Sequence, residues 1–571
     1  KMRTEQMPDD HIISRRQDVN RKLNESWMAR ESLAATMAAS HMRSTRLNPT
    51  MAAASAVKGI QSWLKTTVKA PKTQPLPPRS NKIADEVAEE LKQALVDRRV
   101  KTVLTRSLSL LVQDPSKTAR LYQENQTASE ICSDLIANEV VEERAFNLVD
   151  LGRIARNATT FRNVYPLLAP MISVAENADD VVLQQMALAG VGFTCRTGQE
   201  VVALNAALER IGLDFDEVRL RDANPCKARS HLNSLIRLGA SEICVDSAAE
   251  VKRVAVAYSN AGRTEDLSKI TLCVQLNALP CCCPVEAQGS VALPFCPACA
   301  EEELQAVVAA GRLLGMNRID LALNMDGLPL LPVPMLDSIL LPAAALVGME
   351  NTDTDTVQRA LAATSAAALA VEAATGRVPA INFDGLPTGS SQSSEALAAF
   401  HALLAASLPR QARGGARLLT VEAGGVLLAG GSHLAARVQG SRRVPVPSAP
   451  SAAMEEDAYQ ATQYYLDDGC YGSLSGLLLD TDKDGRRRRP VISTTLDARG
   501  KPLPRTELAP ATVWGPTCDG VDCVAKLATL PPSLGAGDWV VVEDVGAGRP
   551  RGRATDFNGL KTAEPVYCLH R

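Results

Sequence analysis

Short β-rich runs alternate with helical segments through the middle of this 571-residue chain. The alternation extends over 161–421, and it predicts strands at Met171–Ala175, Val218–Ala223, Glu242–Val245, Ile270–Leu276, Ile319–Leu323, Val378–Phe383 and Leu418–Val421. Strand–helix units repeated at this spacing build a parallel sheet, and about seven or eight of them fit a closed (β/α)8 barrel. The predicted fold class is therefore α/β, with a TIM-like barrel at its centre.

The pattern changes after Leu427, where β segments punctuated by glycine and proline replace the helices. Such segments occur at Gly476–Leu479, Pro490–Ser493 and Asp538–Val542. Strands without intervening helices indicate a separate β domain at the C-terminal end.

The segment Ser32–Ala84 contains no Asp or Glu, and eight Lys and Arg residues are spread through it. It has too few large apolar residues to form a core, so we expect an arm that lies across other proteins. The alternative is a disordered tail. Helical spacing of apolar residues predicts helices at Asp85–Val100 and Lys101–Val112.

Composition excludes several classes of protein. The formal net charge of −3 argues against a general nucleic-acid binder. No run of about 18 uninterrupted apolar residues is present, which argues against a membrane span. The 14 cysteines are too few for a disulfide scaffold in a chain of this size, so we expect a reducing compartment, cytosol or organelle matrix.

Three motifs carry a family resemblance: Asp222-Ala-Asn-Pro-Cys-Lys227, Tyr464-Tyr-Leu-Asp-Asp-Gly-Cys-Tyr-Gly-Ser473 and Trp514-Gly-Pro-Thr-Cys-Asp-Gly520. With them the chain resembles the ornithine decarboxylase and antizyme inhibitor family, from about Ala128 to the C-terminus. Active members of that family carry pyridoxal phosphate and have the alanine-racemase-like fold. The resemblance implies that a strand at Ala145–Val149, before the barrel, joins the β domain. The predicted domains are an N-terminal arm over 1–128, a lead-in strand over 129–155, the barrel over 156–430 and the β domain over 431–571.

The same resemblance places Ala175 where the family has the lysine that binds the cofactor covalently, in the run Pro170–Asn177. Alanine has no nucleophile. Most other cofactor positions differ as well: Thr194 for an aspartate, Met325 for the histidine that stacks on the ring, Asp384, Gly385 and Leu386 for the glycine turn, Gly425 for the phosphate-binding arginine, and Gly548 for a phosphate-contacting tyrosine. The carboxylate that partners the pyridine nitrogen is retained as Glu422. These differences predict that pyridoxal phosphate is lost and that decarboxylation is abolished.

Two further groups are candidate sites. Asp468, Cys518 and Asp519 match positions that face the substrate across a dimer interface in the family, and they either form a residual pocket or pack the β domain. Cys281 or Cys283 with Cys296 and Cys299 has a spacing that resembles a zinc site, and the alternative is a metal-free insertion.

Our first functional hypothesis is an inactive accessory subunit of a larger assembly, bound through the 1–128 arm and the inserted loops. The arm is basic, and the first residue, Lys1, is compatible with a cleaved presequence. Both features favour a mitochondrial host such as a respiratory-chain complex, associated peripherally with a membrane. The alternative location is the cytoplasm. The second hypothesis is a regulator of polyamine synthesis that resembles antizyme inhibitors, or an inactive partner of an active decarboxylase. A zinc enzyme ranks third. Nucleic acid is not an expected partner, and the sequence leaves open whether the family homodimer persists.

Overall fold

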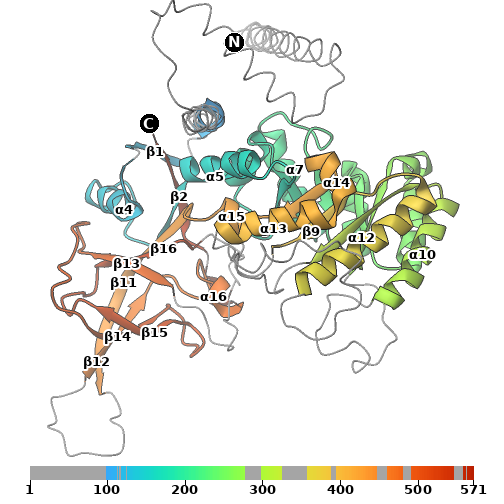
Figure 1. Ribbon diagram of the computed structural model, residues 1–571. Coiled ribbons are helices and arrows are strands. Elements are labelled where there is room, and N and C mark those ends of the chain that lie inside the picture. Colours follow the sequence, from blue (N-terminus) through green and yellow to red (C-terminus); the bar gives the residue numbers. More distant parts are fainter. Residues whose placement is uncertain are drawn as a thin grey trace, which may run out of the picture. The chain divides into compact units, whose positions relative to one another are not determined.

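Eight parallel strands close into a barrel in the computed structural model (Figure 1). Their order around the barrel is β10, β3, β4, β5, β6, β7, β8 and β9, so each strand lies beside its neighbour in sequence and the last closes on the first. Their bounds are β3 Ala169–Ser173, β4 Gly192–Cys195, β5 Leu220–Asp222, β6 Glu242–Val245, β7 Thr271–Gln275, β8 Arg318–Asn324, β9 Ile381–Asp384 and β10 Leu419–Glu422. The predicted fold class is confirmed.

The structure describes residues 98–111, 114, 117–123, 125–276, 297–324, 356–386, 394–445, 460–479, 490–545, 557–560 and 562–570. All of them fall within one unit, Asp85–Arg571. The segment Ser32–Ala84 therefore lies outside the described residues. A single helix over 98–111 crosses the boundary between the two helices expected there, and its Val100 and Val103 pack against Ala155.

The barrel strands alternate with helices on the outer surface. The helices are α5 Leu151–Val164, α6 Asp180–Leu188, α7 Gly198–Glu209, α8 Arg229–Leu238, α9 Ala248–Asn260, α10 Pro297–Leu313, α12 Thr356–Thr375, α13 Ser394–Ser407, α14 Pro409–Gly414 and α15 Gly424–Leu427, with short 3-10 turns at Thr264–Lys269 and Gly415–Arg417. Local sequence sets where they begin, because side chains of Asp150, Asp179, Thr197 and Ser247 accept backbone N–H groups at the starts of α5, α6, α7 and α9. Apolar side chains between strands and helices form the largest core cluster.

A second sheet has nine strands, in the order β1, β17, β2, β11, β12, β14 and β15, with β16 paired to β11 and β13. The bounds are β1 Thr118–Tyr122, β2 Phe146–Asp150, β11 Ser432–Pro445, β12 Gln460–Leu466, β13 Val491–Leu496, β14 Ala509–Trp514, β15 Cys523–Leu530, β16 Trp539–Glu543 and β17 Glu564–His570. The strand expected at Ala145–Val149 is β2, which pairs with β11 and β17. Helices α4 (Ala128–Ala137) and α16 (Gly476–Leu479) and a short turn at Phe557–Gly559 complete this part.

The strand expected at Gly476–Leu479 is wrong, because those residues form α16. Leu477 and Leu474, one helical turn apart, are both buried in the core of the β domain. A short turn of helix thus buries Leu477 in the core despite the local β-like composition.

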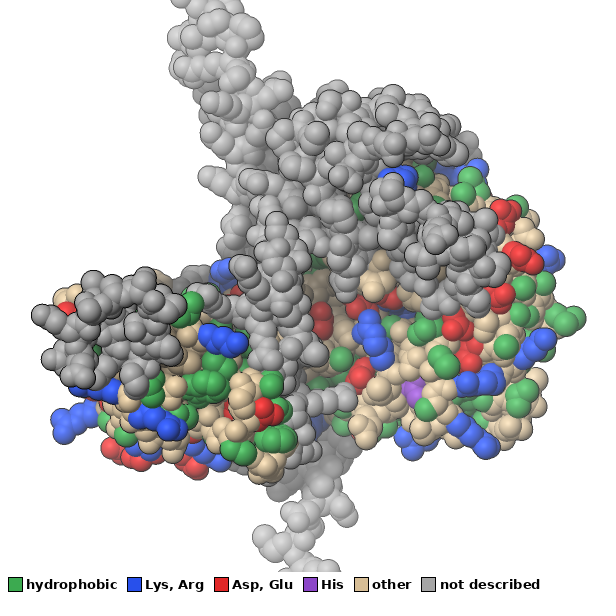
Figure 2. All heavy atoms as spheres, turned by 90° about the horizontal axis from the view of Figure 1, so that it is seen from below, with side chains coloured by type: hydrophobic (Ala, Val, Ile, Leu, Met, Phe, Trp, Pro, Cys, Tyr) green, Lys and Arg blue, Asp and Glu red, His purple; other side chains and the backbone are tan. Residues whose placement is uncertain are grey.

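Among the described residues, none of the helices combines the length and hydrophobicity that a bilayer crossing requires. Figure 2 shows both signs of charge interspersed with hydrophobic side chains on the described part of one face.

Candidate functional site

The carboxyl ends of the barrel strands carry a group of charged side chains that point inward. Successive residues of a strand face opposite sides of the sheet, so Arg221 of β5 faces the barrel interior and Asp222 faces the surrounding helices. Arg221 is fully buried and forms an ion pair with Asp384 at the end of β9. Its Nη2 also lies 3.7 Å from Glu422 at the end of β10.

A second arginine completes this group. Arg196, just after β4, donates from Nη2 to both carboxylate oxygens of Glu422, at 3.4 and 3.3 Å, and from Nη1 to the Ser173 hydroxyl at 2.8 Å. Burial alone lowers the pKa of Arg221, but the carboxylates of Asp384 and Glu422 raise it by more, and the net shift is upward. Two cations therefore neutralise two carboxylates inside the barrel mouth.

Ala175 lies two residues beyond the end of β3, on the turn that follows the strand. Its neighbour Val174 is buried and donates its backbone N–H to Thr194 of β4 at 3.0 Å. Ala175 was expected within the strand Met171–Ala175, but β3 ends at Ser173, so the residue follows the carboxyl end of the strand, and its side chain there is a methyl group.

The positions expected to cradle a phosphate differ from a glycine-rich turn. Gly385 has φ +93°, in the left-handed region that glycine tolerates, but Leu386 beside it is buried. Gly425 lies in the first turn of α15, and a Cβ atom on the adjacent Gly424 would overlap the Glu176 carboxylate. The Glu176 carboxylate thus lies against the start of α15, where the resemblance places the phosphate. Two other positions of the expected cofactor site, Met325 and Gly548, lie outside the described residues.

These residues do not fit the family's way of holding the cofactor. Among the residues that contact the cofactor in the family, Glu422 is retained, but here its carboxylate accepts hydrogen bonds from Arg196. Lys227 is the only lysine among the buried residues that the structure describes, and it pairs with Asp222 and Glu250, at 3.3 and 3.1 Å, on the helix side of the barrel wall. No described lysine therefore substitutes for the missing amine within the barrel.

The C-terminal candidates lie in loops of the β domain. Asp468 is buried, and its carboxylate accepts hydrogen bonds from the backbone N–H groups of Gly469 and Ser473, at 2.7 and 2.9 Å. These hydrogen bonds lower the pKa of Asp468, but burial raises it by more, to about 6. Asp519 accepts a hydrogen bond from the Tyr471 hydroxyl, and Cys518 is exposed.

Asp522 organises these loops, a role that the sequence did not reveal. Its carboxylate is fully buried and accepts hydrogen bonds from the backbone N–H of Cys470 at 2.8 Å, and from the backbone N–H and hydroxyl of Thr517 at 3.0 and 2.7 Å. It therefore ties the Tyr464–Ser473 motif to the Trp514–Gly520 motif.

The predicted zinc ligands Cys281, Cys283 and Cys296 lie outside the described residues, as does the side chain of Cys299 at the start of α10. Elsewhere, the described part of the chain contains no group of three His, Cys, Asp or Glu residues placed to hold a metal ion. The zinc site stays a prediction.

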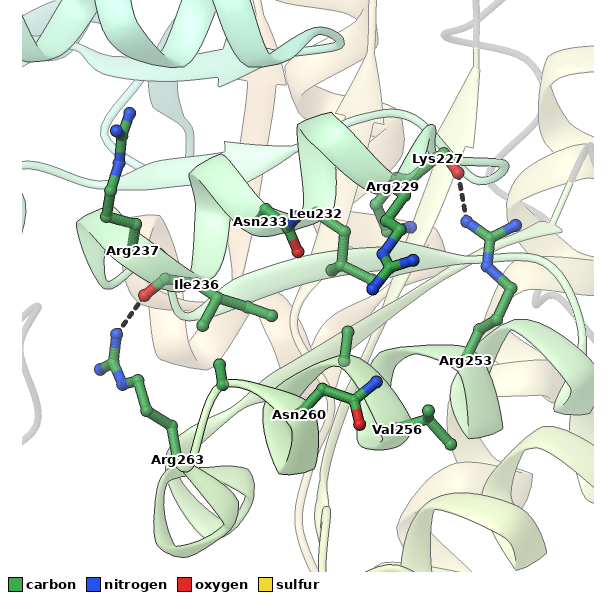
Figure 3. A pocket seen from close by; sticks show the side chains of 12 residues that line it. Lys227, Arg229, Leu232, Asn233, Ile236, Arg237, Arg253, Val256, Asn260 and Arg263 are labelled. Carbon is green, nitrogen blue, oxygen red and sulfur yellow. Dashed lines mark hydrogen bonds between the residues drawn. The ribbon is translucent and has the colours of Figure 1, made fainter.

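A groove of about 870 Å³ lies between α8 and α9 (Figure 3). Four of its lining residues are arginines: Arg229, Arg237, Arg253 and Arg263. Arg253 and Arg263 donate to backbone oxygens of Lys227 and Ile236, and they also pair with Glu250 and Asp266. Arg229 reaches over the space between the helices, and Val256, 58% exposed, contributes an apolar surface.

The chain can now be compared with known proteins. The domain "Pyridoxal-dependent decarboxylase, pyridoxal binding domain" matches residues 151–319, and "Pyridoxal-dependent decarboxylase, C-terminal sheet domain" matches residues 431–546. The chain belongs to the pyridoxal-dependent decarboxylase family.

Within that family it is similar to ornithine decarboxylase of Caenorhabditis elegans, with 24% identity over 77% of this chain and 91% of the relative. Antizyme inhibitor 2 of Xenopus laevis is also 24% identical, over 79% of this chain and 87% of the relative. Among solved structures, lysine/ornithine decarboxylase of Vibrio vulnificus shares the fold, with a TM-score of 0.54 and 20% identity over 77% of this chain and 99% of that one. Arginine decarboxylase of Paramecium bursaria Chlorella virus does so with a TM-score of 0.55 and 18% identity, over 76% and 99%.

The prediction that pyridoxal phosphate has been lost is wrong. The pyridoxal binding domain matches over 169 residues, 151–319, and the structural relatives are decarboxylases of the same fold, so the comparisons point to pyridoxal phosphate binding. The error came from inferring loss of binding from single contact positions, namely the missing lysine and the altered phosphate and ring-stacking residues. Ala175 excludes a Schiff base at that position, but it does not decide whether the cofactor is held by other contacts.

Proposed function

We propose that this protein is a member of the family that does not decarboxylate amino acids and acts by binding other proteins. The observation that carries the first half is Ala175 at the barrel mouth, with no described lysine in its place. Pyridoxal phosphate, when bound, supplies the electron sink of decarboxylation. Without an amine at position 175, the chain has no group there to exchange with the substrate amine or to return a proton.

The protein-binding half rests on the groove between α8 and α9. Its exposed Arg229 and Arg237 have no ion-pair partner among the described residues, whereas Val256 offers an apolar contact beside them. Arginine around an apolar centre is typical of a surface that binds an acidic protein segment. The relatives include an antizyme inhibitor, so we propose regulation of polyamine synthesis, through antizyme or an active decarboxylase.

A second candidate is the accessory subunit of a mitochondrial assembly. The observation that favours it is the stretch Ser32–Ala84, with eight basic and no acidic residues. Such an arm can become ordered by lying across partner subunits.

Activity is tested with the purified chain, saturating pyridoxal phosphate, and ornithine, lysine or arginine in turn. We expect no release of carbon dioxide above that of pyridoxal phosphate alone. Turnover that depends on the protein would overturn the proposal.

Partner binding is tested by capture of purified antizyme and of an active decarboxylase. The double variant Arg229→Glu/Arg237→Glu should lose the partner, because it reverses charge on the exposed side of the groove. Lys252→Glu, an exposed change on α9 outside the groove, should retain it. Mass spectrometry of the natively purified protein separates the candidates: antizyme or a decarboxylase supports regulation, and a stoichiometric multi-subunit complex supports the accessory subunit.

A further inference from the structure

A pocket of about 500 Å³ lies between the helix over 98–111, α5 and the end of α6. Three arginines line it, Arg98, Arg99 and Arg162, and no Asp or Glu does. The pocket extends to Gly190, two residues before β4 begins, so it lies at the amino ends of the barrel strands. It is therefore separate from the barrel mouth and from the groove between α8 and α9.

The positive charge of the three arginines is not neutralised. Within the described part of the chain, no carboxylate pairs with any of their guanidinium groups. Arg99 donates from Nη1 to the side-chain oxygen of Asn163 at 3.3 Å, and Arg162 donates from Nη1 to the backbone oxygen of Ala189 at 2.8 Å. Both acceptors are neutral, so they position the two guanidinium groups and leave their charge uncompensated.

Packing fixes Arg162 close to Arg99. A Cβ atom on Gly190 would overlap the Arg162 guanidinium, so this group lies directly against the backbone of residue 190. Burial lowers the pKa of Arg162, and the positive charge of Arg99 lowers it further. The two cations therefore repel each other at short range. An anion between them would replace this repulsion by attraction.

The remaining lining of the pocket is apolar or already hydrogen-bonded. Val103 is buried and Leu188 half-buried, and both belong to the small core that joins the helix over 98–111 to α5. The hydroxyl groups of Thr102 and Thr159 donate to backbone oxygens of their own helices, at 2.9 and 2.8 Å. The arginines are thus the donors that face a ligand, above an apolar floor.

We infer that this pocket binds the diphosphate group of a small molecule. A guanidinium is always charged, and its planar fork of N–H donors matches two phosphate oxygens. Three such groups exceed the charge of one phosphate, about −1.5 to −2 at neutral pH, whereas a diphosphate can neutralise all three. The volume is within the range of small-molecule pockets, roughly 300–1,000 Å³. The inference goes beyond the proposed function and does not depend on it.

Calorimetric titration of the full chain with inorganic pyrophosphate, in metal-free buffer at constant ionic strength, tests the inference. Arg98→Gln/Arg99→Gln removes two exposed guanidinium groups and should weaken binding about tenfold or more. The matched control, Lys101→Gln/Lys252→Gln, removes two positive charges from exposed positions outside the pocket and should bind as the wild type does. No binding to the wild type, or equal affinities of the two double variants, would overturn the inference.

A further variant separates the paired donors from the charge. Arg162→Lys keeps the positive charge but loses the fork of N–H groups, so it should bind pyrophosphate severalfold more weakly. An unchanged affinity would mean that diffuse positive charge attracts the anion, which contradicts a built site. Tighter binding of a glutamate-rich peptide than of pyrophosphate would assign the pocket to an acidic protein segment and would also overturn the inference. Binding of ADP that is lost in Arg98→Gln/Arg99→Gln would support it.

Discussion

Arg196 donates from one nitrogen to both oxygens of Glu422, at 3.4 and 3.3 Å. Glu422 is the carboxylate that the family resemblance assigns to the pyridine nitrogen of the cofactor. In this chain it is bound by Arg196, which follows β4, and the Arg221 guanidinium also lies 3.7 Å from it. The charge that would face a pyridinium is thus already neutralised within the protein.

Removing that carboxylate should destabilise the barrel. In Glu422→Gln the two arginines are left with Asp384, and we expect the free energy of unfolding to fall by about 3 kcal/mol, as when one partner of a buried ion pair is removed. Urea unfolding measures the change. The control is Glu142→Gln, which breaks an exposed pair with Arg144 and should cost less than about 1 kcal/mol. Equal losses would show that the barrel network contributes no more than a surface pair.

Restoring the amine should allow a covalent link. With pyridoxal phosphate and borohydride, Ala175→Lys should acquire a pyridoxyl group at position 175, because the side chain then enters the barrel mouth near Glu422. Peptide mass spectrometry locates the adduct. Ala137→Lys, at the exposed end of α4, controls for reaction with any surface amine. Labelling of the two variants to the same extent would show that residue 175 is not at a cofactor site.

The barrel was predictable because each of its strands and helices is specified by a local sequence pattern, and these patterns recur along the chain. The strand expected at Glu242–Val245 has the observed bounds, and the ends of the other six expected strands differ from the observed ones by one to three residues. The ion pair between Arg221 and Asp384 was not predictable, because its partners are 163 residues apart and meet only when the barrel closes. In the sequence, Asp384 stands where the family has the glycine turn that binds the phosphate. The structure shows that Arg221 neutralises this carboxylate.

The contact between His231 of α8 and Asp222 was equally hidden. An alanine at an N-cap and a histidine three residues later carry no motif, and their meaning depends on Asp222 of the preceding strand. The wrong prediction that pyridoxal phosphate is lost has a related origin. It was based on single contact residues, whereas the match to the pyridoxal binding domain extends over residues 151–319.

The close approach of Glu176 to Gly424 gives a paired prediction. In Gly424→Ala the new methyl group must displace the Glu176 carboxylate, the far end of a flexible side chain, and we expect a loss of about 1 kcal/mol in the free energy of unfolding. The double variant Glu176→Ala/Gly424→Ala should recover most of it, because the overlapping atoms are gone. Chemical denaturation of the four proteins gives the coupling energy. If the two losses simply add, the carboxylate does not occupy this position.

Asp468 should make stability depend on pH. Its pKa is about 6 in the folded protein, above the ordinary value of 3.8, because burial disfavours the charged form. The folded state therefore binds more protons between these values, and the free energy of unfolding should fall by up to about 3 kcal/mol as the pH rises from about 4 to above 6. Asp468→Asn keeps an acceptor for the N–H groups of Gly469 and Ser473 but does not titrate, so its stability relative to wild type should increase over the same range. Denaturation at pH 4, 5, 6 and 7 measures the difference, with the exposed Asp216→Asn as the control for loss of one charge; parallel profiles for Asp468→Asn and wild type would contradict the raised pKa.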